Sequence, residues 1–232
     1  MLDIQDLLVQ RGHGAQAHRV CLPSLQLGAG EILAITGESG CGKSTLLEAI
    51  GLLLAPSQLG QFRLGRDGLD IGQMLAADDQ AALTQVRSRD LGFILQSGGL
   101  LPFLKVRDNI SLPRRLLGMS EHSSHVEGAI GALRLDALLD KLPHALSIGE
   151  RQRVACVRAI AHEPQLLLAD EPTAALDPHS AQRLFELLLS LVAELGLSAL
   201  VVSHDWALVR DFGLNRMGAI SHAGETRFEP MD

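Results

Sequence analysis

Aromatic residues are scarce in this sequence: they make up 3% of its 232 residues, with no Tyr and a single Trp. A base-stacking platform for single-stranded nucleic acid needs such rings, so that kind of site is not expected. Basic residues are also few, since 20 Lys and Arg stand against 27 Asp and Glu and give a formal net charge of −7. Without a basic run, the chain lacks the usual means of binding a phosphate backbone, and we expect no nucleic acid partner.

Long hydrophobic runs are missing as well. The richest apolar stretches, "AIGLLLAP" (49–56) and "SALVVS" (198–203), are far shorter than the ~20 residues of a membrane-spanning helix. Met1 leads into "LDIQDLLVQ" without the basic and apolar regions of a secretory signal. We therefore expect a cytoplasmic chain, and any membrane span in its assembly has to come from another subunit.

Cysteine occurs three times, at Cys21, Cys41 and Cys156. An odd number without a secretory signal predicts free thiols in a reducing compartment. No Cys and His residues have zinc-finger spacing, so a zinc site is not expected.

Short apolar runs alternate with helical patterns, and apolar residues make up 47% of the chain. Buried strands are predicted at 31–37, 91–96, 165–170 and 198–204, and helices at 43–54 and 177–196. Strands alternating with helices indicate a mainly parallel sheet covered on both faces. The segment 98–160 is poor in strands and helical in character, which predicts an inserted helical subdomain.

The stretch "GESGCGKST" (37–45) follows one strand and opens a helix, which is the context of a P-loop. Glycines let backbone N–H groups curl around phosphate oxygens, and the helix N-terminus adds positive potential. Lys43 is expected to reach the β- and γ-phosphates, and the Ser44 hydroxyl to ligate Mg²⁺. The residues expected to bind nucleotide here are Gly37, Glu38, Ser39, Gly40, Cys41, Gly42, Lys43, Ser44 and Thr45.

Two carboxylates end the strand in "LLLADEPT" (166–173). Beside a P-loop, Asp170 is expected in the Mg²⁺ shell and Glu171 as the base that polarises a water for attack on the γ-phosphate. Taken alone, the pair could equally be an acidic turn before a helix. Gln96 and His204, which each end an apolar run, are ambiguous by themselves.

Another helix start is predicted by "LSIGE" (146–150). Ser147 and Glu150 have the spacing of a capping box, in which each side chain bonds the backbone N–H of the other residue. With Ser147 as the N-cap, Ile148 is the first helical residue and its φ is negative, so its bulk does not harm the fold.

Together these stretches resemble the ATP-binding subunits of ABC transporters, and they occur in the family's order over nearly the whole chain. The resemblance identifies "GESGCGKST" as Walker A, "LSIGE" as the signature, "LLLADE" as Walker B and "ALD" (175–177) as the D-loop. It makes Gln96 the Q-loop glutamine, catalytic and near Mg²⁺, and His204 the catalytic switch histidine. The implied fold is a P-loop NTPase core (1–97 and 161–232) with an antiparallel β part near the N-terminus and a helical subdomain (98–160).

The resemblance also implies partners. The signature helix of such a subunit faces ATP held by a second copy, so two complete sites require a head-to-tail homodimer. Ser147, Gly149, Glu150 and the D-loop Asp177 are then expected at the partner's nucleotide. The other partner is an integral-membrane permease, which places the chain on the inner face of the cell membrane.

Two positions depart from the family pattern. Ile148 replaces the first glycine of the signature, and Arg11 stands where an aromatic ring usually meets adenine. A guanidinium plane can stack on a base, so Arg11 is the candidate adenine contact. His13 is the other candidate. Alternatively, both are solvated loop residues that do not contact the nucleotide.

Within the family, "QSGGLLPFLKVRDNISLP" (96–113) resembles the group of lipoprotein-release, macrolide-export and cell-division ATPases, although Lys105 stands where that group usually has Thr. This predicts an ATP-hydrolysing transport subunit. The alternatives are a regulatory scaffold with little turnover and a soluble non-transport ABC ATPase. A P-loop kinase is not expected, because kinases do not need the signature motif.

Overall fold

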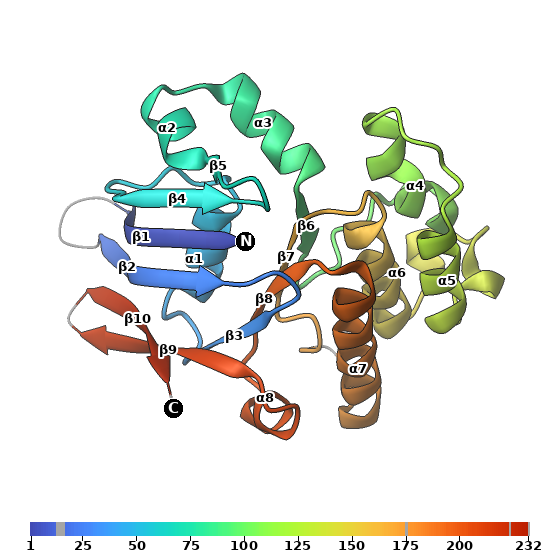
Figure 1. Ribbon diagram of the computed structural model, residues 1–232. Coiled ribbons are helices and arrows are strands. Elements are labelled where there is room, and N and C mark those ends of the chain that lie inside the picture. Colours follow the sequence, from blue (N-terminus) through green and yellow to red (C-terminus); the bar gives the residue numbers. More distant parts are fainter. Residues whose placement is uncertain (13–16, 175, 223, 232) are drawn as a thin grey trace.

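The computed structural model describes residues 1–12, 17–174, 176–222 and 224–231. Within them a ten-stranded sheet has the order β5-β4-β1-β2-β10-β9-β3-β8-β7-β6 (Figure 1). The strands are β1 (Leu2–Arg11), β2 (His18–Leu27), β3 (Ile32–Thr36), β4 (Gln61–Leu64), β5 (Leu69–Asp70), β6 (Leu91–Ile94), β7 (Leu166–Asp170), β8 (Ser198–Val202), β9 (Asn215–His222) and β10 (Glu225–Met231).

The sheet has two regions. Strands β9, β3, β8, β7 and β6 are neighbours that pair in parallel. The pairs β1–β2, β1–β4, β4–β5 and β9–β10 are antiparallel, and β10 joins this part to β2 by a parallel pairing. The predicted mainly parallel core with an antiparallel part near the N-terminus is therefore confirmed, and the C-terminal hairpin β9–β10 belongs to it as well.

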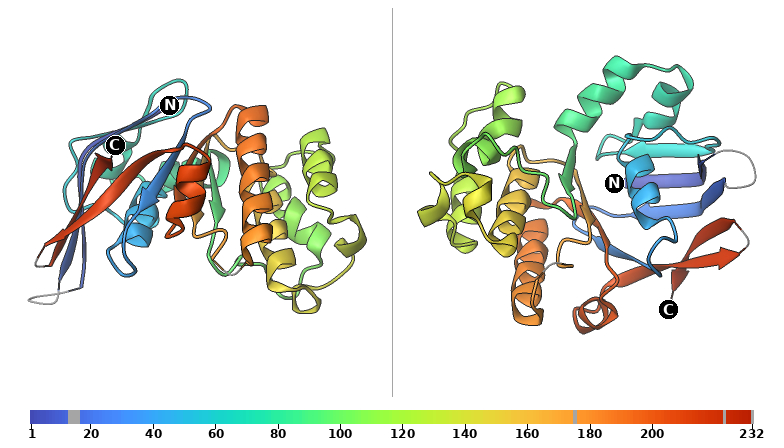
Figure 2. Two further views of the ribbon diagram at one scale, coloured as in Figure 1. Left: turned by 90° about the horizontal axis from the view of Figure 1, so that it is seen from below. Right: turned by 180° about the vertical axis from the view of Figure 1, so that it is seen from behind.

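The helices cover both faces of the parallel region (Figure 2). In the regions outside 98–160 they are α1 (Lys43–Ile50), α2 (Ile71–Ala76), α3 (Gln80–Arg89), α7 (Pro178–Leu195) and α8 (Trp206–Asp211). Residues 98–160 contain α4 (Val106–Leu116), α5 (Ser124–Ala132), α6 (Ile148–Ile160) and the 3-10 turns η2 (Asp136–Leu138) and η3 (Pro143–Ala145), and no strand. Figure 1 shows α4, α5 and α6 grouped beside the β6 edge of the sheet.

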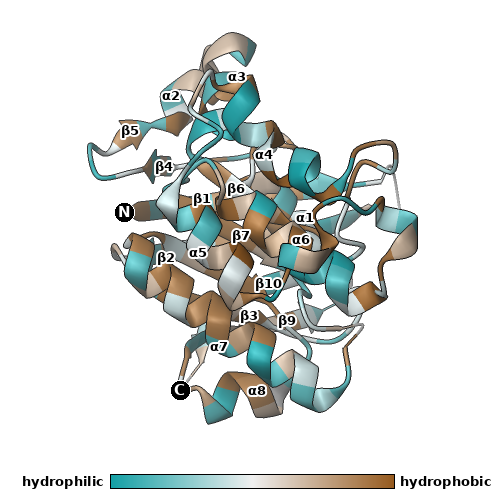
Figure 3. Ribbon diagram, turned by 90° about the vertical axis from the view of Figure 1, so that its right-hand side faces the viewer, coloured by the Kyte–Doolittle hydropathy of each residue, from teal (hydrophilic) through white to brown (hydrophobic). Residues whose placement is uncertain are grey.

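The alternation of side chains along a strand explains the unbroken apolar runs 166–169 in β7 and 199–202 in β8. Leu166 and Leu168 pack into the apolar cluster around α1, whereas Leu167 and Ala169 pack into the cluster around α6 and α7. Since successive side chains point to opposite faces, a strand covered on both faces needs an unbroken apolar run. Helix α7 supplies a long apolar stripe to the second cluster, visible as brown ribbon in Figure 3.

Several element ends differ from the sequence prediction, and β8, for example, ends at Val202 rather than at 204. The helix predicted at 43–54 stops at Ile50, because Gly51 caps it and Leu52 takes a positive φ of 59°. Strand β6 ends at Ile94, two residues before the end of the predicted segment at Gln96. Helix α7 matches its signals, with Asp177 as N-cap, Pro178 as first residue and Gly196 as C-cap. No helix in the described part of the chain is both long and apolar enough to cross a membrane.

Candidate nucleotide site

The phosphate loop joins β3 to α1 through a backbone that requires glycine. Gly42, the N-cap of α1, has φ 101°, in the left-handed region that L side chains rarely adopt. A Cβ added there would come within 2.6 Å of the Val20 Cγ2 atom. Both conformation and space therefore explain why glycine precedes Lys43.

Lys43 lies inside this loop. Its side chain is buried, and its Nζ donates hydrogen bonds to the carbonyl oxygens of Gly37 at 2.9 Å and Glu38 at 2.7 Å. The Cys41 thiol is buried 3.9 Å from the same ammonium. The positive charge thus lies at the centre of the loop, where phosphate oxygens would be bound.

Ser44 and Asp170 lie together at the adjoining ends of α1 and β7. Burial raises the pKa of the Asp170 carboxyl above its ordinary value, and a side-chain hydrogen bond from Ser44 lowers it by a smaller amount. The charge of Glu171 raises it further and that of Lys43 lowers it. A hydroxyl and a carboxylate oxygen are the hard donors that Mg²⁺ prefers, so this pair fits the ion.

Glu171 is contacted by two other residues predicted for the site, Gln96 and His204. Its Oε2 accepts a hydrogen bond from Gln96 Nε2 at 3.1 Å, and His204 Nδ1 lies 3.3 Å from the same oxygen. The backbone of Glu171 has φ 47° and donates its N–H to the Val202 carbonyl at 3.0 Å. A non-glycine residue in this region is uncommon, and such residues concentrate at functional sites.

These residues come from adjacent parallel strands. Strand β3 leads into the phosphate loop, β8 precedes His204, β7 ends in Asp170, and β6 precedes Gln96. Because parallel strands all end at the same edge of a sheet, the neighbouring order β3-β8-β7-β6 places segments from far apart in the sequence side by side.

The signature forms the helix start that the sequence predicts. Ser147 is the N-cap of α6, Glu150 N donates to Ser147 Oγ at 3.2 Å, and Ser147 N donates to Glu150 Oε2 at 2.7 Å. The hydrogen bonds from Ser147 lower the pKa of the Glu150 carboxyl. Ile148 is the first helical residue and is 53% exposed. Among the described residues, this end of α6 has no hydrogen bond to the chain's own phosphate loop.

The D-loop passes close to the signature. A Cβ on Gly149 would lie 3.1 Å from Leu176 Cδ2, which is tighter than most such contacts. Asp177 caps α7 by accepting a hydrogen bond from Ser180 N at 3.1 Å, and hydrogen bonds from the side chain and the backbone of Ser180 lower the pKa of its carboxyl. Ala175, the first residue of the predicted D-loop, is outside the described residues.

Arg11 ends β1 beside the phosphate loop. Its guanidinium forms an ion pair with Glu48 and donates to Thr45 Oγ1 at 3.5 Å. The candidate adenine contact is therefore held against α1 by a carboxylate that sequence reasoning did not single out. The alternative, His13, is outside the described residues.

Sequence reasoning also missed Arg158. From α6 this side chain donates to the carbonyl oxygens of Gly98 and Gly99 at 2.9 and 2.7 Å, and Gln152 donates to Leu95 O at 3.4 Å. The segment after Gln96 is thus bonded to the signature helix. The signal was present in "ACVRAI" (155–160), where a cation interrupts apolar residues on a buried helix.

Comparison with known proteins gives a consistent result. A sequence model described as "ABC transporter" matches residues 22–174. The lipoprotein-releasing system ATP-binding protein LolD of Ruegeria sp. (strain TM1040) is 42% identical over 186 residues, which is 79% of each chain. The methionine import ATP-binding protein MetN of Cupriavidus pinatubonensis is 39% identical over 214 residues, covering 90% of this chain but 60% of that protein.

Solved structures agree on the fold. The dimeric ATP-binding cassette MJ0796 in a post-hydrolysis state, bound to ADP and Pi, superimposes with a TM-score of 0.81 at 29% identity, covering 100% of this chain and 99% of that one. A second dimeric structure of MJ0796 matches equally well. With the motif order and the site geometry, these matches show that the chain belongs to the ABC transporter family, as one of its ATP-hydrolysing, nucleotide-binding subunits.

Proposed function

We propose that this subunit hydrolyses ATP at the site around Glu171 and thereby drives a separate membrane permease of the lipoprotein-release type. The observation that carries the proposal is the convergence of Gln96 and His204 on one carboxylate oxygen of Glu171. The carboxylate follows Asp170 directly, and Asp170 lies beside Ser44 of the phosphate loop.

The residues divide the chemistry among themselves. The loop N–H groups and Lys43 hold the phosphates. Ser44, Asp170 and Gln96 are the residues that would bind or face Mg²⁺. The ion would neutralise charge on the β- and γ-phosphates. Glu171 accepts a proton from a water whose oxygen attacks the γ-phosphorus, while the bond from phosphorus to the bridging oxygen breaks and ADP leaves. Gln96 and His204 orient the Glu171 carboxylate and the water.

The signature supports a head-to-tail dimer. The first N–H groups of α6 have no acceptor in their own helix, apart from that of Glu150, which bonds Ser147. Ser147, Gly149 and Glu150 are proposed to contact ATP bound by a second copy, and Asp177 to lie at the same interface. The dimeric form of MJ0796 supports this arrangement.

Arg11 is proposed to stack on adenine. Its ion pair with Glu48 holds the guanidinium near Thr45, and a guanidinium plane can cover a base while keeping such an ion pair. This pairing replaces the ring that other members of the family use.

A permease is proposed to dock where the segment after Gln96 meets the helical region, on a subdomain that we assign to 98–160 between core segments 1–97 and 161–232. An apolar groove of about 310 Å³ lies there, and it is lined in part by Leu101, Leu112, Leu116 and Arg158. Leu116 is 76% exposed and the nearby Phe103 is 73% exposed. Since Arg158 both lines the groove and bonds the segment after Gln96, an apolar helix seated there would act on the site. This docking would place the subunit on the cytoplasmic face of the membrane.

The ATPase assignment is tested with purified protein. Glu171→Gln should retain ATP but lose nearly all hydrolysis, because it removes the base and spares the phosphate loop. The matched control is Glu127→Gln, an exposed residue of α5 that should hydrolyse ATP at the wild-type rate. A Glu171→Gln protein with wild-type turnover would refute the role of Glu171.

The transport assignment needs a separate test. The chain is reconstituted in vesicles with a permease of the lipoprotein-releasing type, and ATP turnover is compared with that of the subunit alone. Stimulation by the permease supports a transport motor. Tight binding to the permease with ATP but without stimulated turnover would instead favour a regulatory scaffold, and no binding would favour a non-transport ATPase.

A further inference from the structure

Three arginines line one pocket outside the nucleotide site. The pocket measures about 520 Å³ and lies between the end of α5, the side of α6 and the outer face of α7. Arg134, Arg153 and Arg183 contribute to its lining. Figure 3 shows the side of the molecule on which α5 and α7 lie.

None of the three guanidinium groups has a hydrogen bond or ion pair within the described part of the chain. Other arginines there, such as Arg107 and Arg114, do form ion pairs. The hydrogen bonds from Ser147 lower the pKa of the Glu150 carboxyl most, and the charge of Arg153 adds a smaller lowering. Arg134 and Arg183 are exposed, whereas Arg153 is half-buried, so the pocket gathers three cations at its wall in a chain whose net charge is −7.

One donor in this set is both buried and unsatisfied. Arg153 Nε is shielded from solvent and has no hydrogen-bond acceptor. Leaving a buried donor of a charged group unpaired is costly, and protein structures usually provide a partner. Arg134 follows α5 in a left-handed conformation (φ 53°), at a position where glycine is the usual residue.

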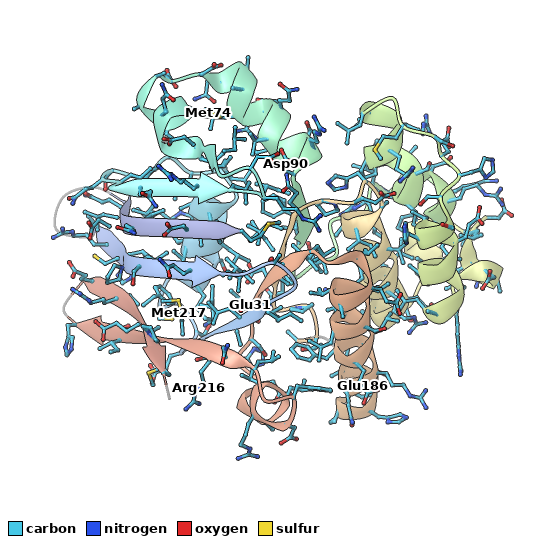
Figure 4. All side chains as sticks on the ribbon, in the orientation of Figure 1. Glu31, Met74, Asp90, Glu186, Arg216 and Met217 are labelled. Carbon is cyan, nitrogen blue, oxygen red and sulfur yellow. The ribbon has the colours of Figure 1, made fainter. Side chains whose placement is uncertain are left out.

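The rest of the lining sets the chemistry of the ligand. Leu133, Leu176, Leu184 and Leu187 form an apolar wall, and Ser180 and Ser190 add hydroxyl groups. Glu186, labelled on α7 in Figure 4, supplies one carboxylate, which already accepts a hydrogen bond from Gln182 at 3.0 Å. Three cations and one anion leave an excess of positive charge, which suits a dianion.

We infer that this pocket binds a small organic phosphate, with its phosphate oxygens on the three arginines and its apolar part against the leucines. Guanidinium groups match phosphate in geometry and charge, and the volume is within the range of small-molecule sites. A ligand there contacts α5, α6 and α7 together, so it ties the signature helix to the helix that follows the D-loop. The inference does not rest on the proposed transport function.

Binding is measured by ¹⁹F NMR with 4-fluorophenyl phosphate as the probe. The wild-type chain should bind one equivalent, and raised ionic strength should weaken binding. Arg134→Gln and Arg183→Gln should each weaken binding about tenfold to a hundredfold, because each removes charged hydrogen bonds. Arg89→Gln, which removes an exposed arginine at the end of α3, is the matched control and should bind like wild type. Thermal melts check that each variant is folded.

A Lys43→Ala variant separates this pocket from the phosphate loop, and it should still bind the probe. Loss of probe binding in Lys43→Ala, or equal loss in Arg89→Gln, would overturn the inference. So would a folded wild-type protein that binds no probe.

Two further arms identify other occupants. Sedimentation with vesicles that contain phosphatidic acid tests for a lipid headgroup, and sedimentation velocity with ATP tests for a second copy of the chain. If the arginine variants lose vesicle binding or dimerisation while the wild type binds no soluble probe, the pocket is not a small-molecule site.

Discussion

Arg158 donates a hydrogen bond to the carbonyl oxygen of Gly98 at 2.9 Å, which connects the signature helix to the loop that begins at Gln96. Burial lowers the pKa of Arg158, although a guanidinium stays charged at neutral pH. Since Gln96 contacts Glu171, we expect a shift of α6 to reach the Glu171 carboxylate through Arg158, together with Gln152, which donates to Leu95 O.

Arg158→Lys should therefore slow hydrolysis more than it weakens binding. An ammonium keeps the charge but cannot reproduce the fork that bonds both Gly98 and Gly99. We expect kcat to fall about tenfold with KM for ATP little changed. Arg107→Lys, at an exposed ion pair, is the control. A change in KM alone would show that Arg158 does not position Gln96.

Lys43→Ala should weaken nucleotide binding about tenfold to a hundredfold, because it removes a charged hydrogen bond to phosphate. Binding is measured by titration with a fluorescent ATP analogue. The same change removes the donor that satisfies the carbonyls of Gly37 and Glu38, so the melting temperature should fall too. Unchanged affinity in a folded variant would exclude phosphate contact by Lys43.

Asp170→Asn should stabilise the fold at neutral pH while impairing Mg²⁺-dependent binding. The folded pKa of Asp170 is raised mainly by burial, so its favourable contribution is complete below the unfolded value and is lost as pH rises through the folded pKa. The stability advantage of Asn over Asp should thus grow from pH 3 towards pH 7 in urea denaturation.

The exposed Asp67→Asn serves as the charge control for that series and should show no such growth. An Asp170→Asn protein whose advantage is constant with pH would mean that ionisation of the buried carboxyl costs the fold nothing.

Ile148→Gly should raise ATP-driven dimerisation and turnover without altering the nucleotide affinity of the monomer. The Ile148 side chain is exposed at the end of α6 that is proposed to face the partner's ATP. Ile148→Ala should be intermediate if bulk is the cause. Light scattering with ATP in a Glu171→Gln background reports dimerisation, and lower turnover of Ile148→Gly would show that Ile148 is a working part of the site.

Patterns within short stretches of sequence correctly predicted the strands and helix starts that depend on neighbouring residues. The apolar runs gave β3, β7 and β8 because both faces of these strands are covered, and the Ser147–Glu150 spacing gave the start of α6 because a capping box involves only neighbouring residues. Gly51 shows the limit of such signals. The apolar run continues past it to Leu54, and the helix end depends on backbone conformation that periodicity does not report.

Contacts between distant segments were harder to predict. Three contacts join elements whose relative placement follows from the sheet order. They are the ion pair of Arg11 with Glu48, the hydrogen bond from Arg158 to Gly98, and the approach of Leu176 to Gly149. The strand order of the sheet cannot be inferred from a pattern within a short stretch of sequence. The Gln96–Glu171–His204 cluster was anticipated only through resemblance, because each residue alone is ambiguous.

The strand order has a consequence for how the chain is made. The strand that precedes the phosphate loop, β3, pairs with β8 and β9, both of which come late in the sequence. During synthesis from the N-terminus, residues 32–36 therefore emerge long before either partner strand exists. Until residues 198–222 leave the ribosome, the segment beside Lys43 has no neighbour in the sheet and β7 lacks β8. A nascent chain interrupted before β8 therefore carries every phosphate-loop residue while β3 lacks both of its partner strands.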